Sequence, residues 1–257
     1  MATKCKKRSN VLRLTDAVGS LHGRNADKDN RVRKLLADWD ALADKLRRMV
    51  VRGGGSTETA VLAYATLLMM ETGIRVGNEE SAEGFVSVNK WHPDCGKLVK
   101  TYGLTTLEGR HVSVEGGVLT LAFVGKKIVN QTLRTADPFL VRYAPVPQAA
   151  DLPWLGIDYP TLYKFVKKYV GRAYKPKDIR AAKVNRLFID NFAGPRAANF
   201  AAAAKKSDRN RAVKECVEVT AETIGHTPGV CRSAYMSKHL LSVLKDYDPA
   251  THPTITK

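Results

Sequence analysis

Residues 60–70 read AVLAYATLLMM, and this run indicates where the core of the fold lies. It is apolar almost all round, and a helix of that kind lies inside a core rather than on a surface. Ser56 is expected to cap its start, and Gly73 is expected to end it, which leaves Arg75 just beyond the helix end. One helical face is marked by the i, i+3, i+4, i+7 spacing of Val61, Tyr64, Ala65 and Leu68.

The residues before this helix predict another helix and a polar lead-in. Apolar positions recur at helical spacing through residues 31–52, and three glycines, Gly53 to Gly55, end the pattern. Residues 1–30 are basic and turn-rich with little periodicity, which predicts a lead-in arm. Helices are therefore expected over 31–85, apart from the glycine turn.

Residues 102–134 have a different character. The short runs GLTTL, HVSV, VLTLAFV and IVNQT are rich in β-branched residues, and glycine-containing turns separate them. This pattern predicts a small antiparallel sheet of about three strands joined by hairpins. Lys126 falls in the last hairpin turn.

After a proline-rich connector at 144–153, the chain is predicted to be helical over 154–246. Thr227 and Pro228 have the residue types of a helix N-cap and first position. The fold class is therefore mainly α with a small antiparallel β-sheet, an α+β arrangement. We expect one catalytic domain over 31–257, preceded by the arm.

Charge indicates the class of partner. The 257 residues contain 42 Lys and Arg against 25 Asp and Glu, a net charge of +17, which favours a polyanion such as nucleic acid. A ribosome-associated scaffold and an anionic membrane surface are the alternatives. The sequence has no apolar run of membrane-spanning length, no secretory signal and no CxxC pair, so an intracellular, reducing location is expected: the cytoplasm or nucleoid, or a virion or nucleus if the source is viral.

Five segments together resemble the type IB DNA topoisomerases of the small poxviral and bacterial kind. In chain order they are ETGIRVGNEE (71–80), YGLTTLEGRHV (102–112), FVGKK (123–127), KDIRAAKVNRLF (177–188) and GHTPGVCRSAYMSK (225–238). The resemblance covers about residues 60–245. It implies a catalytic core of the type IB topoisomerase and tyrosine recombinase kind. The chain is expected to depart from the family in lacking the N-terminal β domain, either as a minimal form or as a catalytic-domain fragment. The segment 87–101 stands out as an insert relative to the family.

The resemblance assigns a role to one residue in each of five motifs. Tyr235 is the expected nucleophile, Arg75, Arg180 and His226 stabilise the transition state, and Lys126 is the general acid. These residue types suit phosphodiester cleavage, because a phenol oxygen makes a reversible covalent bond, guanidinium groups bind the phosphorane and an ammonium protonates the leaving oxygen. Lys127 is the alternative to Lys126.

No cofactor or metal is expected, since the sequence pairs these residues with neither an acidic metal cluster nor a phosphate-binding glycine loop. The expected activity is ATP- and metal-independent nicking and religation of duplex DNA by a monomer. A tyrosine recombinase or integrase is one alternative, although Lys177 occupies the place where recombinases have histidine. A non-catalytic, basic DNA-binding module is the other.

Overall fold

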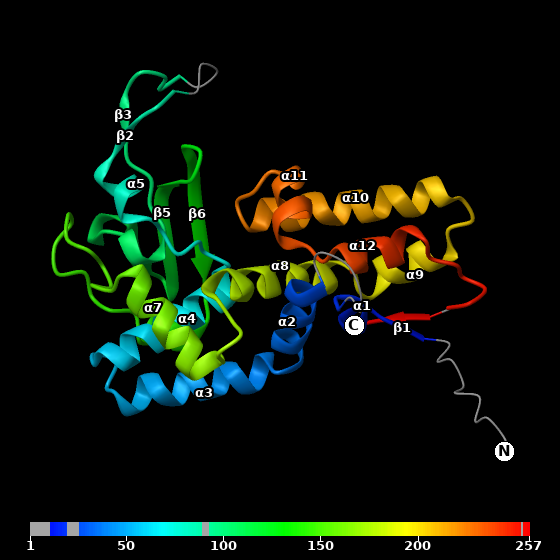
Figure 1. Cartoon of the computed structure of the whole chain (residues 1–257), viewed down its shortest axis with the longest axis horizontal. Helices are drawn as coiled ribbons and strands as arrows, with labels where there is room; N and C mark the ends of the chain where they lie inside the picture. Colours follow the sequence, from blue (N-terminus) through cyan, green and yellow to red (C-terminus); the bar gives the residue numbers. More distant parts are fainter. Residues whose placement is uncertain (1–10, 20–25, 89–92, 253) are drawn as a thin grey trace. The chain divides into compact units, whose positions relative to one another are not determined.

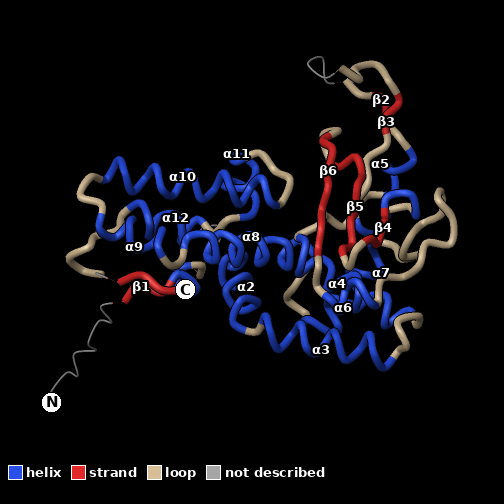
Figure 2. Tube along the Cα trace, turned by 180° about the vertical axis from the view of Figure 1, so that it is seen from behind, coloured by secondary structure: helices blue, strands red, loops and turns tan. Residues whose placement is uncertain are grey.

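The computed structural model describes residues 11–19, 26–88, 93–252 and 254–257. The chain divides into two compact units: a smaller unit of Met1–Ala37 with Val184–Lys257, and a larger unit of Asp38–Lys183. Helices predominate and strands are few (Figures 1 and 2), so the expected mainly α fold with a small antiparallel sheet is confirmed. The expected arm at 1–30 and catalytic domain at 31–257 stay a prediction.

The larger unit is built around α4 (Glu58–Thr72), whose residues are nearly all buried, as the apolar run predicted. Gly73 ends this helix in the left-handed conformation, with φ of 67°. The expected cap was wrong by one residue, because the Oγ1 of Thr57, not of Ser56, accepts a hydrogen bond from the Ala60 amide. The other helices of this unit are α3 (Trp39–Arg52), α5 (Glu79–Glu83), α6 (Pro138–Arg142), α7 (Tyr159–Phe165), which continues as the π-helical turn η3 (Val166–Val170), and the part of α8 (Pro176–Phe192) up to Lys183.

The helix expected over 31–52 is two helices. The first, α2 (Ala26–Ala37), belongs to the smaller unit, and α3 starts after Asp38. Val32 and Leu35 are buried in α2, and Leu42, Leu46 and Val50 are buried in α3. The apolar spacing continues across the break, so periodicity could not reveal it.

The sheet of the larger unit has the order β4-β5-β6 and is antiparallel throughout. Its strands are β4 (Val112–Glu115), β5 (Val118–Gly125) and β6 (Val129–Thr135). The run GLTTL is not a strand: it forms the 3-10 helix η1 (Leu104–Thr106), and a second one, η2 (Gly109–His111), follows. Two short strands pair at the 87–101 insert: β2 (Phe85–Val86) ends directly before it and β3 (Leu98–Val99) lies within it. Residues 89–92 of the insert lie outside the described residues.

The smaller unit joins the two ends of the described chain. Strand β1 (Val11–Arg13) pairs in parallel with β7 (Thr254–Thr256), and Leu14 of α1 (Leu14–Ala17) and Val18 are completely buried. Residues 11–19 are thus packed, whereas 1–10 and 20–25 of the expected arm lie outside the description. The remaining elements are the end of α8 (Pro176–Phe192), α9 (Pro195–Ala202), α10 (Lys206–Thr223), α11 (Pro228–Val230), the π-helical turn η4 (Cys231–Tyr235) and α12 (Lys238–Lys245). Among the described residues, no helix has both the length and the apolar character that crossing a bilayer requires.

Candidate active site

Arg75 lies in the loop that follows α4, and its backbone is fixed by η1. The Arg75 carbonyl accepts a hydrogen bond from the Leu104 amide (2.7 Å), and the Val76 carbonyl accepts one from the Thr105 amide (2.6 Å). The two segments touch so closely that a Cβ at Gly103 would lie 2.8 Å from the Arg75 carbonyl oxygen. The Arg75 side chain is half-buried. The motif around Gly103 therefore serves to hold the arginine loop in place.

Lys126 is at the tip of the β5–β6 hairpin, as the sequence predicted. The last strand pair is Gly125 with Val129, so residues 126–128 form the turn. Lys127 and Ile128 both have positive φ, 65° and 61°, which is unfavourable for side chains with a Cβ and especially for a β-branched one. Lys126 and Lys127 are both exposed. Exposure therefore does not distinguish the two lysines.

Arg180 is buried on α8, with an exposed fraction of 5%. The Lys175 amide donates to a carboxylate oxygen of Asp178 (3.0 Å), which stabilises the start of the helix. The helix begins at Pro176, so Arg180 lies in its second turn. The helix dipole acts mainly within the first turn, so it contributes little at Arg180.

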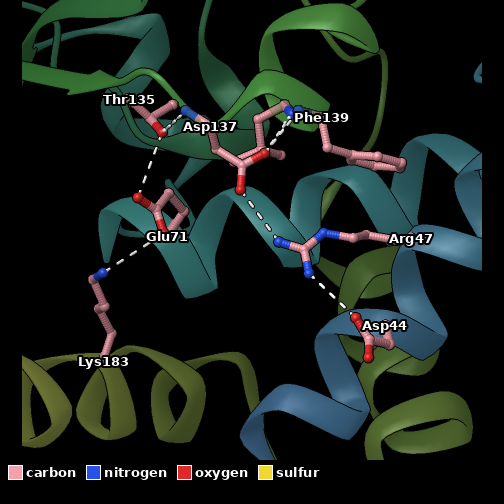
Figure 3. Close-up of polar contacts among 8 residues, drawn as sticks. Asp44, Arg47, Glu71, Thr135, Asp137, Phe139 and Lys183 are labelled. Carbon is pink, nitrogen blue, oxygen red and sulfur yellow. Dashed lines mark hydrogen bonds and ion pairs between the residues drawn. The ribbon is translucent and has the colours of Figure 1, made fainter.

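A polar network connects three of these elements within the larger unit (Figure 3). Glu71 of α4 forms an ion pair with Lys183 of α8 (3.8 Å) and accepts a hydrogen bond from Thr135 at the end of β6 (3.4 Å). Asp137, which caps α6, forms an ion pair with Arg47 of α3 (3.2 Å). Single exposed pairs stabilise little, but this network links the helix before Arg75, the strand after Lys126 and the helix of Arg180.

His226 and Tyr235 lie against each other in the smaller unit. Their ring centroids are 4.9 Å apart and their planes differ by 15°, a stacked arrangement. Thr227 caps α11 between them, with its Oγ1 accepting from the Val230 amide (3.4 Å), as the Thr-Pro signal predicted. The short helix turns the chain back, so that residues nine apart in the sequence come into contact.

Tyr235 ends a π-helical turn. The Met236 amide donates to the Cys231 carbonyl (3.1 Å), and Cys231 and Tyr235 are both buried, with exposed fractions of 0% and 5%. The burial agrees with a packing role for Cys231. Insertions of this kind often occur where a helix bears a functional group.

The resemblance assigned no role to Asn185, a completely buried residue of α8 that lies within the segment KDIRAAKVNRLF. Its amide nitrogen donates to the Tyr235 carbonyl (3.1 Å), and its amide oxygen accepts from the Ser237 amide (2.9 Å). The side chain therefore binds the backbone at Tyr235 and two residues beyond it. In the sequence, the signal that could have identified Asn185 is its position: it is a polar residue five positions after Arg180 on a helix expected to be buried.

The site residues divide between the units. Arg75, Lys126 and Arg180 are in the larger unit, and His226 and Tyr235 are in the smaller one. In the described part of the chain, no group of three His, Cys, Asp or Glu side chains is placed to hold a metal ion.

The chain is similar to several viral proteins. It is 25% identical over 153 residues to the DNA topoisomerase 1B of vaccinia virus (strain Copenhagen), a match that covers 57% of this chain and 46% of the viral protein. It is 22% identical over 249 residues to the DNA topoisomerase 1B of Acanthamoeba polyphaga mimivirus, which covers 88% of this chain and 67% of that protein. The DNA topoisomerase 1 of rabbit fibroma virus is 28% identical over 155 residues.

The match spans about half the length of the poxviral relatives, and no protein-family model matches the chain. The similarity nevertheless recurs among viral proteins, called DNA topoisomerase I in monkeypox virus and DNA topoisomerase 1B in vaccinia virus and the mimivirus. The chain is therefore a relative of the type IB DNA topoisomerases.

Proposed function

We propose that this chain nicks and reseals one strand of duplex DNA through a 3′-phosphotyrosyl intermediate, without ATP or metal, and so relaxes supercoils. It acts as a monomer with the catalytic core of the type IB topoisomerase and tyrosine recombinase kind, wherever DNA is kept in a cell or virion. The observation that supports this most directly is the stack of His226 on Tyr235. The relatives named DNA topoisomerase 1B support the substrate class.

In the proposed cleavage step, the Tyr235 oxygen attacks the phosphorus. A bond forms between that oxygen and phosphorus, the bond from phosphorus to the 5′ oxygen breaks, and the electron pair leaves with the 5′ oxygen. Lys126 supplies the proton that this oxygen takes up, and the phenol proton goes to solvent. The exposed hairpin tip suits this role, because it can reach into a DNA groove.

Three groups stabilise the pentavalent phosphorus. Arg75 and Arg180 offer charged donors to the non-bridging oxygens, and burial of Arg180 strengthens its electrostatic effect. His226 is stacked on Tyr235, and its imidazole donates to a phosphate oxygen beside the attacking phenol in the proposed step.

Resealing is the reverse reaction. The energy of the broken phosphodiester remains in the phosphotyrosine, so no nucleotide is consumed. Torque in the DNA rotates the free 5′-hydroxyl end before that end attacks the phosphotyrosine.

The test is Tyr235→Phe, which removes the nucleophilic oxygen and little else. Covalent adduct with DNA and relaxation of supercoiled plasmid, both measured without ATP or magnesium, should be lost together. Tyr247→Phe is the matched control, because Tyr247 is also a buried tyrosine of the smaller unit, and it should retain both activities.

The outcomes separate the alternatives. Relaxation by the Tyr235→Phe variant would overturn the assignment of the nucleophile. Strand exchange between specific sites would identify a recombinase, and DNA binding by the wild type without any adduct would identify a binding module.

A further inference from the structure

Two consecutive residues of α2 contact the segment that bears Tyr235. The Lys28 ammonium donates to the carbonyl of Ala234 (2.9 Å), directly before the tyrosine. The next residue, Asp29, has a carboxylate oxygen 2.9 Å from the Ser237 hydroxyl, two residues after the tyrosine. More than 200 residues separate these partners in the sequence, yet all of them belong to the smaller unit.

The Asp29–Ser237 contact is buried, with exposed fractions of 1% and 0%. Burial of a carboxylate is unfavourable unless hydrogen bonds compensate it, so a contact of this kind is strongly specified. The Ser237 hydroxyl also lies 2.6 Å from the Val18 carbonyl oxygen and accepts from the Leu240 amide (3.2 Å). Ser237 therefore joins the end of the tyrosine turn, the start of α12 and the N-terminal segment.

We propose that Asp29 and Ser237, assisted by Lys28, are positioning residues that hold the Tyr235 oxygen in line with the scissile phosphate. This inference rests on the proposed function. Asn185 fixes the same stretch from α8, and the α2 contacts fix it from an element far away in the sequence. A backbone shift of about 1 Å at a reacting group can reduce a rate about 10²-fold, so the benefit of this double attachment lies in orientation.

The central variant is Ser237→Ala, which deletes one buried oxygen. With a suicide duplex at saturating concentration, its single-turnover rate of adduct formation should fall by about 10- to 100-fold while the Kd for DNA stays unchanged. Asp29→Asn retains an acceptor for the hydroxyl and should stay within about threefold of the wild type.

Phe200→Leu is the matched control for stability. Phe200 is buried in α9 of the same unit, and its ring contacts are with Phe192 and Tyr247. The Phe200→Leu substitution lowers the free energy of unfolding, but it should not slow adduct formation in the folded protein. Equal slowing by Ser237→Ala and Phe200→Leu, at equal loss of stability, would overturn the positioning role.

A second measurement does not depend on catalysis. Amide hydrogen exchange over residues 231–240 should become faster in Ser237→Ala and stay unchanged in Phe200→Leu. Unchanged exchange in Ser237→Ala would refute the attachment. If the wild type forms no adduct, the proposed function fails, and the exchange experiment still decides whether α2 holds the tyrosine segment.

Discussion

In the larger unit, Arg75, Lys126 and Arg180 lie on a loop, a hairpin turn and a helix. The Arg75 loop is held by residues about 30 positions away, and the Lys126 turn is held by its own strands. In the smaller unit, the segment around Tyr235 is held by Lys28 and Asp29 of α2, which lie 206 and 208 positions from their partners in the sequence. The partner of Asp29 is Ser237, which is completely buried.

The difference corresponds to what each group would do in the proposed reaction. An arginine or lysine has a long side chain that can compensate for a small displacement of its backbone, and it acts mainly through charge. A tyrosine nucleophile has few rotatable bonds and needs a defined line of attack. Changes around the cations are therefore expected to affect charge and local folding, whereas changes around the tyrosine affect orientation.

After loss of the Tyr235 oxygen itself, the largest effect is expected at the hairpin tip. Lys126→Ala should slow cleavage roughly 10²–10⁴-fold if Lys126 is the general acid. The side chain is exposed at the turn, so stability should not change. Single-turnover adduct formation and thermal unfolding measure the two quantities separately.

Lys127→Ala is the control, because Lys127 is the next residue of the same turn and is also exposed. A duplex with sulfur at the 5′ bridging position provides a leaving group that needs no proton. This substrate should restore the Lys126→Ala variant far more than Arg75→Ala or Arg180→Ala. Equal restoration of all three variants would mean that Lys126 binds phosphate, as proposed for Arg75 and Arg180. Lys126 would then not be the general acid.

The next effect is expected at Gly103, where the Arg75 loop meets η1. A Cβ there would lie 2.5 Å from the Gly77 amide nitrogen, so Gly103→Ala should displace the loop and cost about 1–3 kcal/mol of unfolding free energy. Adduct formation should fall with it, because Arg75 moves. All three tryptophans of the sequence fall in residues 38–183, so tryptophan fluorescence follows unfolding of the larger unit.

Gly229→Ala is the counterpart in the smaller unit. A Cβ there meets no atom within 4 Å, so this variant should unfold like the wild type. If Gly103→Ala were equally harmless, the close contact between η1 and the arginine loop would not be what fixes Arg75.

Local signals made much of the fold predictable. The all-apolar run located the central helix, Gly73 ended it, and the strand–turn pattern placed Lys126 on a hairpin. Predictions failed where a signal was ambiguous. The run GLTTL contains β-branched threonines, which favour a strand, yet the segment forms a 3-10 helix. The Thr106 hydroxyl stabilises this turn because it accepts a hydrogen bond from the Gly103 amide and donates one to the Gly103 carbonyl.

The candidate site was predictable to a different extent. Motifs selected five candidate residues, which stay a prediction, and the structure brings two of them, His226 and Tyr235, into contact. The residues that hold the tyrosine were not predictable, because Lys28 and Asp29 look like ordinary charges on a polar helix. Only the three-dimensional contacts with Ala234 and Ser237 distinguish them.

The smallest effect is expected from His111, which packs against Tyr102 in the larger unit with ring centroids 4.3 Å apart. Burial, the largest influence, lowers the pKa of His111 below the ordinary value of 6.5, and the Glu108 amide donates to its Nδ1 (3.0 Å). That hydrogen bond requires a neutral Nδ1. The stabilisation by neutral His111 is therefore fully present above the unfolded-state pKa of its imidazole. It is lost as the pH falls through the lower folded-state pKa of that imidazole.

Between about pH 7.5 and about pH 5, the free energy of unfolding of the larger unit should fall by about 1 kcal/mol more in the wild type than in His111→Gln. One neutral hydrogen bond contributes about that much. Urea unfolding followed by tryptophan fluorescence measures this. Amide exchange at residues 231–240 of the smaller unit should show no difference between the two proteins, because the described contacts of His111 lie within the larger unit. A difference in amide exchange at residues 231–240 as well would mean that the two units do not respond separately to protonation of His111. The contrast between cations held by nearby residues and a tyrosine held by residues distant in the sequence would then need revision.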